Sequence, residues 1–408
     1  MIKRGLWNRR IQSPNINSIQ KRASSKEVTL QLISVFPQLQ NKLEENFIEI
    51  YTSLTPDKHD APRRSVVEPP SGFGMDVWIN VKRTRNTSMF ETTKPILGMI
   101  LATAVVGAGL TSTQAAELKF EHVMSIGTKG DDLGQFGYVE DFDIASNGQH
   151  ILVTDAAHAF VQVFDKTTGE FVSRFGGKGD DDANLDKPEG ISVAPNGDIY
   201  VADYNTGDVK VYDKNYNWKF TFSEYGSEPG QNIKSEFTDI RDGLYYMPEA
   251  GNHRVSVWDL EGNFKFLFGG SGTAEGKMNN PEASKFNSEG HLYVSDLKND
   301  RMQVFDAEGN FLFAWGSSGS EPGQFKAPAG VAIDKDDNVY VSEIGNDRMQ
   351  VFDKKGNLLA IWGSEGSGDG QFDNLHGVFV DQETGWLYIA DTGNDRVQVY
   401  KPAGGSSS

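Results

Sequence analysis

Six copies of one unit, each with four short apolar runs, predict an all-β fold: a six-bladed β-propeller of four-stranded antiparallel blades. Five units close on an aspartate and the sixth on a tyrosine, at intervals of 46 to 48 residues: Asp165, Asp213, Asp259, Asp306, Asp353 and Tyr400. Four short strands cannot bury both faces alone, so the units have to stack. A closed ring of six units leaves no exposed end.

The fifth unit shows the four expected strands clearly. Alternating apolar residues occupy 330–334, 339–342, 348–352 and 358–362, with turn-forming residues such as Asp, Asn and Gly between most of them. The other units repeat this pattern, so each is expected to form one antiparallel blade.

Ring closure can be predicted from the two ends of the repeat region. The sixth unit stops at Tyr400, after its third strand. Residues 118–126, followed by Gly127 and the Gly-Gln-Phe segment at 134–136, match the fourth strand and linker of the other units. We therefore expect this N-terminal strand to complete the last blade.

The propeller is expected to span residues 117–401, with a flexible tail at 402–408. Residues 89–116 read as a signal peptide, because an uncharged apolar stretch at 95–110 follows Lys94 and precedes small residues; a short signal anchor is the alternative. Residues 1–88 form a basic segment expected to be poorly ordered, and an over-extended gene start is one interpretation of it. Export to the periplasm or the exterior follows, with no membrane span in the mature form unless 95–110 is retained as an anchor.

Charge and composition exclude several functions. Residues 117–408 carry 24 Lys+Arg and 48 Asp+Glu, a net charge of −24, which argues against nucleic acid as a partner. The chain has no cysteine, which excludes disulfides, zinc–thiolate sites and thiol nucleophiles. Cations and basic partners remain compatible with this surface.

The repeated motif resembles the NHL-repeat family of propellers. The resemblance rests on the linker Gly323-Gln-Phe325 with Pro328 and Gly330, on Tyr-Val-x-Asp, and on Asn-Asp-Arg-Met/Val-Gln-Val, and it extends over residues 118–401. It implies the propeller scaffold. Because the family includes both binding modules and enzymes, the resemblance leaves the function open.

An acidic residue ends the second strand of every unit, and we expect it to be structural. Four units also carry an arginine that could pair with it inside the same blade. The acidic residues are Asp155, Asp203, Glu249, Asp296, Glu343 and Asp391, and the arginines are Arg254, Arg301, Arg348 and Arg396. Units one and two lack the arginine, so a specialised surface is expected there, with His158 and Tyr204 as candidates.

The position just before each first strand differs between units and is expected to face the central channel. It holds Glu140, Glu189, Glu236, Glu282, Ala329 and His376, the register of Glu236 being uncertain. Glu140, Glu189, Glu282 and His376 are candidate ligands for a divalent cation: Ca²⁺, Mg²⁺, Mn²⁺ or Zn²⁺. The alternative is a solvated acidic rim without an ion. No other cofactor is expected.

Two kinds of enzyme resemble this chain in part. Peptide-amidating lyases are similar propellers with zinc-binding histidines before several first strands; His376 fits that pattern, whereas Glu189 and Glu282 stand where further histidines would be. Gluconolactonase-like propellers hold one divalent cation with carboxylates and an amide in the channel, and the amide has no identified counterpart here.

The sequence favours a binding or scaffold module for a protein, peptide or glycan partner. Tyr216, Trp218 and Tyr225 depart from the repeat and are candidates for an aromatic contact patch. The alternative function is a metal-dependent hydrolase or lyase with its site in the central channel.

Overall fold

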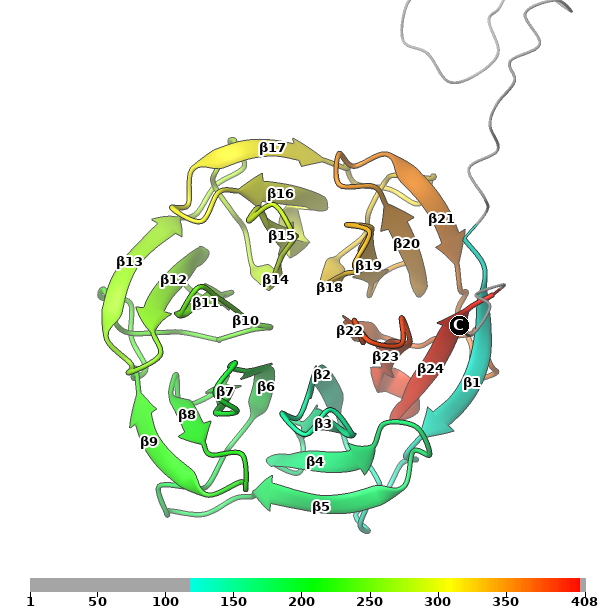
Figure 1. The fold of residues 1–408 in the computed structure, drawn as a ribbon. Helices are drawn as coiled ribbons and strands as arrows, with labels where there is room; N and C mark the ends of the chain where they lie inside the picture. The colour runs from blue at the N-terminus through cyan, green and yellow to red at the C-terminus, as the bar shows by residue number, and fades with distance from the viewer. Residues whose placement is uncertain (1–117, 404–408) are drawn as a thin grey trace, which may run out of the picture. The chain divides into compact units, whose positions relative to one another are not determined.

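Six four-stranded antiparallel sheets form a ring around a central axis (Figure 1), which confirms the predicted propeller. The computed structural model describes residues 118–403. The expected basic segment at 1–88, the expected signal peptide at 89–116 and most of the expected tail lie outside the described residues. Within 118–403 no helix has the length and apolar character needed to cross a membrane.

The first three blades are built from consecutive strands, numbered from the axis outward. Blade 1 comprises β2 (Val139–Ile144), β3 (His150–Asp155), β4 (Phe160–Asp165) and β5 (Phe171–Gly176). Blade 2 comprises β6 (Pro188–Val193), β7 (Ile199–Asp203), β8 (Val209–Tyr212) and β9 (Trp218–Phe222). Blade 3 comprises β10 (Asp239–Arg241), β11 (Leu244–Glu249), β12 (Arg254–Asp259) and β13 (Phe264–Gly269).

The next two blades repeat this order, and two of the loops contain a 3₁₀ turn. Blade 4 comprises β14 (Pro281–Phe286), β15 (Leu292–Asp296), β16 (Arg301–Phe305) and β17 (Phe311–Trp315). Blade 5 comprises β18 (Pro328–Ile333), β19 (Val339–Glu343), β20 (Arg348–Phe352) and β21 (Leu358–Trp362). The 3₁₀ turns are η3 (Leu297–Asn299) in blade 4 and η4 (Thr392–Asn394) in blade 6.

Blade 6 joins the two ends of the propeller, as the sequence predicted. Its strands are β22 (Leu375–Val380), β23 (Leu387–Asp391), β24 (Arg396–Pro402) and, outermost, β1 (Phe120–Ile126). β1 pairs antiparallel with β24, from Phe120 opposite Pro402 to Ile126 opposite Val397. Figure 1 shows β1 and β24 side by side near the C-terminus. The ring is therefore closed by strand pairing.

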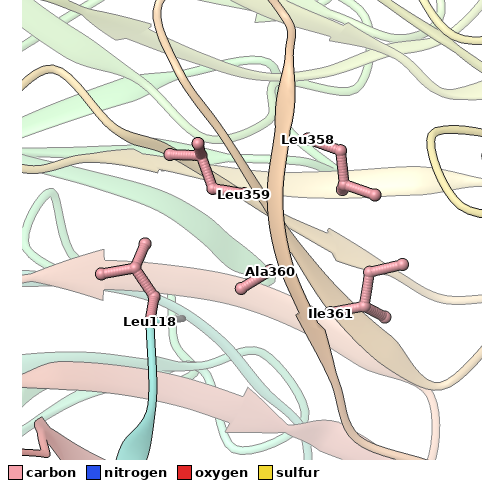
Figure 2. Close-up of a pocket in the computed structure, with 5 residues that line it drawn as sticks. All are labelled: Leu118, Leu358, Leu359, Ala360 and Ile361. Atoms are coloured by element: carbon pink, nitrogen blue, oxygen red, sulfur yellow. The ribbon is translucent and has the colours of Figure 1, made fainter. Parts of the chain in front are cut away.

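The start of β1 also contacts blade 5. Leu118 and Phe120 pack against the apolar cluster between blades 5 and 6, and the Phe120 ring stacks on Trp362 with centroids 4.6 Å apart. Figure 2 shows Leu118 beside β21, where it lines a surface pocket of about 270 Å³ with the aliphatic residues 358–361. The closing strand thus bridges two blades.

The apolar core is divided into six clusters, one between each pair of adjacent blades. The cluster between blades 6 and 1, for example, combines Ile126 with Phe136 and Phe142 from blade 1 and Tyr388 and Val397 from blade 6. Burial of these faces follows from the alternation of apolar residues in the strands. Stacking therefore stabilises every blade through its two neighbours.

The acidic residue at the end of each second strand is structural wherever an arginine accompanies it, as expected. Arg301 Nε donates to Asp296 Oδ2 at 2.8 Å, and its two terminal nitrogens donate to three linker carbonyls. The same ion pair recurs in three other blades: Arg254–Glu249, Arg348–Glu343 and Arg396–Asp391. These side chains hold the loops on the face where the first strands begin, which is called the linker face below.

Candidate functional site

The inner strands of the six blades start on the linker face, around the propeller axis, and we call this region the channel mouth. Five of the six predicted residues are the second residue of their inner strand instead of preceding it, and Glu236 precedes β10. All six are buried, between 0% and 8% exposed: Glu140, Glu189, Glu236, Glu282, Ala329 and His376. Glu236 occupies the same place as the others although β10 begins only at Asp239. Its register, uncertain from sequence, is therefore that of the other blades.

Glycines set how closely the inner strands approach at this mouth. A Cβ on Gly377 would lie 1.9 Å from the Glu140 carbonyl oxygen, and one on Gly190 would lie 2.1 Å from the Glu236 carbonyl oxygen. In blade 1, Thr154 Oγ1 donates to the Glu189 carbonyl oxygen at 2.9 Å. The backbone that carries the mouth residues is thus fixed by contacts between blades, which is why small residues occur at these positions.

The four glutamates influence one another electrostatically. Burial, reinforced by Glu189 and Glu282, raises the pKa of Glu140 well above its usual range, and burial with Glu282 and Glu189 does the same for Glu236. Burial and the charge of Glu189 raise the pKa of Glu282 to about 8. Burial also raises the pKa of Glu189 despite its ion pair with Lys187. Near pH 7 the Glu282 carboxyl is therefore largely protonated.

His376 lies at the mouth in blade 6, and one of its two ring nitrogens is hydrogen-bonded within the same blade. Its Nδ1 lies 3.0 Å from the carbonyl oxygen of Asn374, so Nδ1 carries the proton and donates it. Burial lowers the pKa of His376 to about 4, so the ring is neutral near pH 7. Nε2 is left as an acceptor. The Tyr138 ring packs edge-on against His376 at 5.6 Å.

A rim of lysine and tyrosine surrounds the glutamates on blades 1 to 3. Lys187 Nζ lies 3.9 Å from the centroid of the Tyr204 ring and 5.8 Å from that of Tyr138. Lys234 Nζ lies 5.1 Å from the Tyr204 centroid. We refer to Tyr138, Lys187, Tyr204 and Lys234 as the lysine–tyrosine rim.

Sequence reasoning identified only Tyr204 of this rim. Tyr138, Lys187 and Lys234 each stand two residues before a mouth glutamate. That position also differs from blade to blade, being Asn280, Ala327 and Asn374 in the other three. The same comparison between units that identified the glutamates would therefore have found the lysines.

The other predicted surface residues lie elsewhere. His158 is on the linker face, but its Nδ1 is 2.7 Å from Asp155 and its Nε2 is 3.0 Å from Asp131. Burial lowers the pKa of His158, yet these hydrogen bonds outweigh burial and the pKa is raised overall. His158 thus replaces, in blade 1, the asparagine that bonds the acidic residue in later blades.

Tyr216 and Trp218 lie at the opposite end of blade 2 from Tyr204, in the β8–β9 turn and at the start of β9. The Tyr216 ring stacks on the Phe175 ring with centroids 4.9 Å apart. Tyr216 and Trp218 both pack against the apolar cluster between blades 1 and 2. Tyr225 is 60% exposed in the following linker. The predicted patch of Tyr216, Trp218 and Tyr225 is therefore not brought together, because Tyr225 lies beside Gly207 in the loop that follows Tyr204.

The predicted metal ligands converge only in part. Glu140, Glu189 and Glu282 interact at the mouth, and His376 belongs to the neighbouring blade. Among residues 118–403, however, no three His, Asp or Glu side chains are arranged as a metal-binding group. The ammonium of Lys187 pairs with Glu189, so a cation would have to compete with it. Oxygen ligands and the free His376 Nε2 nevertheless suit a divalent cation chemically.

Comparison with known proteins agrees with the architecture. A family model described as NHL repeat matches residues 185–212, which cover the inner three strands of blade 2. The chain is thus a six-bladed propeller that contains an NHL repeat in blade 2. No curated protein sequence matches it.

Solved structures similar to this NHL propeller share its fold at low sequence identity. An auxiliary nutrient binding protein from Bacteroides thetaiotaomicron is 15% identical, with a TM-score of 0.54 over 70% of this chain and 77% of that chain. A protein of unknown function from the same organism is 15% identical, with a TM-score of 0.55 over 69% and 76%. Virginiamycin B lyase from Staphylococcus aureus is 15% identical, with a TM-score of 0.50 over 70% and 99%.

Proposed function

We propose that this NHL propeller is an exported binding module that holds a protein, peptide or glycan ligand at the channel mouth on its linker face. The ligand would contact the lysine–tyrosine rim of blades 1 to 3, and the buried glutamates would lie beneath it. The remaining blades supply a rigid scaffold.

One observation carries this proposal: side chains that differ between blades meet at the mouth of a frame that the blades share. Apolar clusters lie between adjacent blades, and the arginine–carboxylate pairs recur in blades 3 to 6. The mouth position holds glutamate in blades 1 to 4, alanine in blade 5 and histidine in blade 6, and the position two residues before it varies more. Together these positions bring buried carboxyl groups close to amino and phenol groups. Blade-specific side chains converging on a rigid frame are what selective binding requires. A neighbour in fold is described as a nutrient binding protein, which is compatible with such a role.

The test is binding of the full chain to glycan and peptide arrays, repeated with two variants. Tyr204→Ala removes the ring shared by Lys187 and Lys234 and is expected to abolish or strongly weaken the signal. Asn357→Ala changes an exposed turn at the other end of blade 5 and is expected to leave binding unchanged. Equal loss in both variants, or no loss in Tyr204→Ala, would contradict a site at the mouth.

A second candidate is a metal-dependent hydrolase or lyase acting at the same mouth. Two features favour it. Nε2 of the neutral His376 is available as an acceptor, and the buried carboxyl groups of Glu140 and Glu282 form no ion pair with any residue of 118–403. A metal ion there would supply a Lewis acid or an activated water. A neighbour in fold, from Staphylococcus aureus, is described as a lyase.

Metal content separates the two candidates. Elemental mass spectrometry of the purified protein in metal-free buffer is compared with Glu189→Ala/Glu282→Ala/His376→Ala, with folding checked by circular dichroism. One metal per chain that disappears in the folded variant would favour the enzyme. No metal, or equal metal in both proteins, would favour the binding module.

A further inference from the structure

A pocket of about 350 Å³ lies on the face of the propeller opposite the channel mouth, where the inner strands end. Its wall is formed by the last residues of β10, β14 and β18 and by the turn after β22, so four blades contribute to it. We call it the far-face pocket. Its wall combines apolar and polar side chains, including Ile240, Phe286, Ile333, Arg241, Ser288 and Gln382. Its volume falls within the range of small-molecule sites, roughly 300–1,000 Å³.

A short turn in blade 3 explains why the pocket lies here. Only Asp242 and Gly243 separate the paired residues Arg241 and Leu244 of β10 and β11, and both have positive φ, 51° and 78°. Such a two-residue turn is typical of a type I′ hairpin. The corresponding turns of the other blades are longer, for example 287–291 in blade 4. Blade 3 thus projects less far and leaves space beside the turns of blades 4 and 5.

Hydrogen bonds between blades hold the polar part of the wall in place. Arg241 Nη1 of blade 3 donates to a carbonyl oxygen of blade 4 at 2.8 Å. Ser288 Oγ of blade 4 donates to Asp337 Oδ2 of blade 5 at 2.8 Å, and Gln382 Nε2 of blade 6 donates to the Ile333 carbonyl oxygen at 2.7 Å. A ligand would therefore meet side chains that are already ordered, which lowers the entropic cost of binding.

These bonds leave both a donor and an acceptor for a ligand. Arg241 donates through Nε and Nη1, so its Nη2 remains as a donor. Gln382 donates through Nε2, so its Oε1 remains as an acceptor. The pocket can therefore bind a group that donates and accepts at once, as a hydroxyl does.

The charged groups of the wall are compensated from within the protein. Ion pairs join them to their neighbours: Lys285–Asp239 at 3.6 Å, Lys354–Asp337 at 3.7 Å and Arg241–Asp242 at 3.3 Å. Asp334 accepts a hydrogen bond from the Tyr340 hydroxyl at 3.0 Å, and Lys335 is exposed to water. An anion would meet the lining carboxylates, and a cation would meet the guanidinium and ammonium groups. The wall therefore favours a neutral ligand.

We propose that the far-face pocket binds a neutral pyranose sugar. Its C–H groups would lie against Ile240, Phe286 and Ile333, and its hydroxyl groups would accept from Arg241 Nη2 and donate to Gln382 Oε1. The sugar could be a free molecule or the terminal unit of a glycan. This site is separate from the channel mouth and goes beyond the function proposed for the mouth.

The experiment measures binding of methyl glycosides to the full chain. Those of glucose, galactose, mannose and N-acetylglucosamine are compared with tetrahydropyran-2-methanol, which has the ring but a single hydroxyl. Saturation-transfer NMR and calorimetry at up to about 20 mM ligand are expected to show at least one glycoside binding about tenfold or more tightly than this control compound. Tighter binding of a disaccharide that ends in the same sugar would identify a glycan terminus as the source, and equal or weaker binding a free sugar.

Three variants test the location. Gln382→Met removes the amide and Arg241→Met removes the guanidinium, and each should weaken binding about tenfold or more. Gln149→Met changes an exposed glutamine in the β2–β3 turn, on the same face but outside the pocket, and should bind as the wild type does. Circular dichroism establishes that each variant is folded.

Tyr204→Ala separates this site from the one at the channel mouth and should leave the affinity for the glycoside unchanged. Loss of glycoside binding in folded Tyr204→Ala would place the sugar at the mouth, which would overturn the far-face pocket and leave the proposed function standing. Binding that survives both Gln382→Met and Arg241→Met would also overturn it. So would equal affinity for tetrahydropyran-2-methanol, or no glycoside binding at about 20 mM.

Discussion

Glu282 shows how one buried side chain determines the pH response of the channel mouth. Burial and the charge of Glu189 raise the pKa of its carboxyl to about 8 from an ordinary 4.5. The folded state thus holds a proton that the unfolded state releases. The stabilisation linked to this proton is complete below about pH 4.5 and is lost as the pH rises through about 8.

Replacement of Glu282 by glutamine should therefore raise stability relative to the wild type progressively as the pH rises from about 4.5 to about 8. Glutamine has no proton to lose, so Glu282→Gln is expected to melt about 3 °C or more above the wild type near pH 9 and close to it near pH 5. Thermal unfolding followed by circular dichroism across this pH range measures the difference. Glu308→Gln, an exposed glutamate in the β16–β17 turn, is the control and should change nothing. An equal shift at both pH values would refute the protonation argument.

The inner strands show why the spacing between blades matters for the mouth. Gly377 of β22 packs against the carbonyl of Glu140, and a Cβ at this position would lie 1.9 Å from that oxygen. The equivalent residue of blade 4 is Ala283, whose side chain is accommodated and 1% exposed. The same register position therefore tolerates a methyl group in one blade and excludes it in another.

Gly377→Ala is accordingly expected to destabilise the propeller by roughly 1–3 kcal/mol, because β22 must shift away from β2. Ala283→Gly at the equivalent position of blade 4 should cost about 0.5–1 kcal/mol, through backbone entropy and lost packing alone. Urea unfolding of both variants measures the two free energies. If Gly377→Ala were as stable as the wild type, the close approach of blades 6 and 1 would not be needed.

The repeated elements could be predicted from sequence because each depends on local pattern. The strands, the Arg301–Asp296 type of ion pair and the place of β1 all follow from comparing one unit with the next. Blade 3 was harder to align because β10 has only three residues. The lysine–tyrosine rim depends on distances between blades, and no pattern within one unit contains the approach of Lys187 and Lys234 to Tyr204.

At the scale of the whole molecule, the ring depends on one noncovalent junction within blade 6. β1 covers the outer side of β24, and its Ile126 is 1% exposed within the cluster between blades 6 and 1. The first and last blades also contact each other directly: Lys166 of blade 1 forms an ion pair with the buried Asp381 of blade 6 at 2.9 Å. The Tyr388 hydroxyl donates to the Lys166 carbonyl oxygen at 2.9 Å. These contacts join the first and last blades, but they leave β24 unpaired on one side if β1 is absent.

A chain that begins at Gly127 should therefore be much less stable than the full chain. Removal of β1 exposes the apolar cluster between blades 6 and 1 and leaves β24 as an open edge, at an expected cost of several kcal/mol. The melting temperature should fall by roughly 10 °C or more. A synthetic peptide spanning residues 118–127 should restore most of this loss, because the missing strand can pair with β24 in trans, whereas a scrambled peptide of the same composition should not. An unchanged melting temperature in the shortened chain would show that strand pairing in blade 6 does not hold the ring closed.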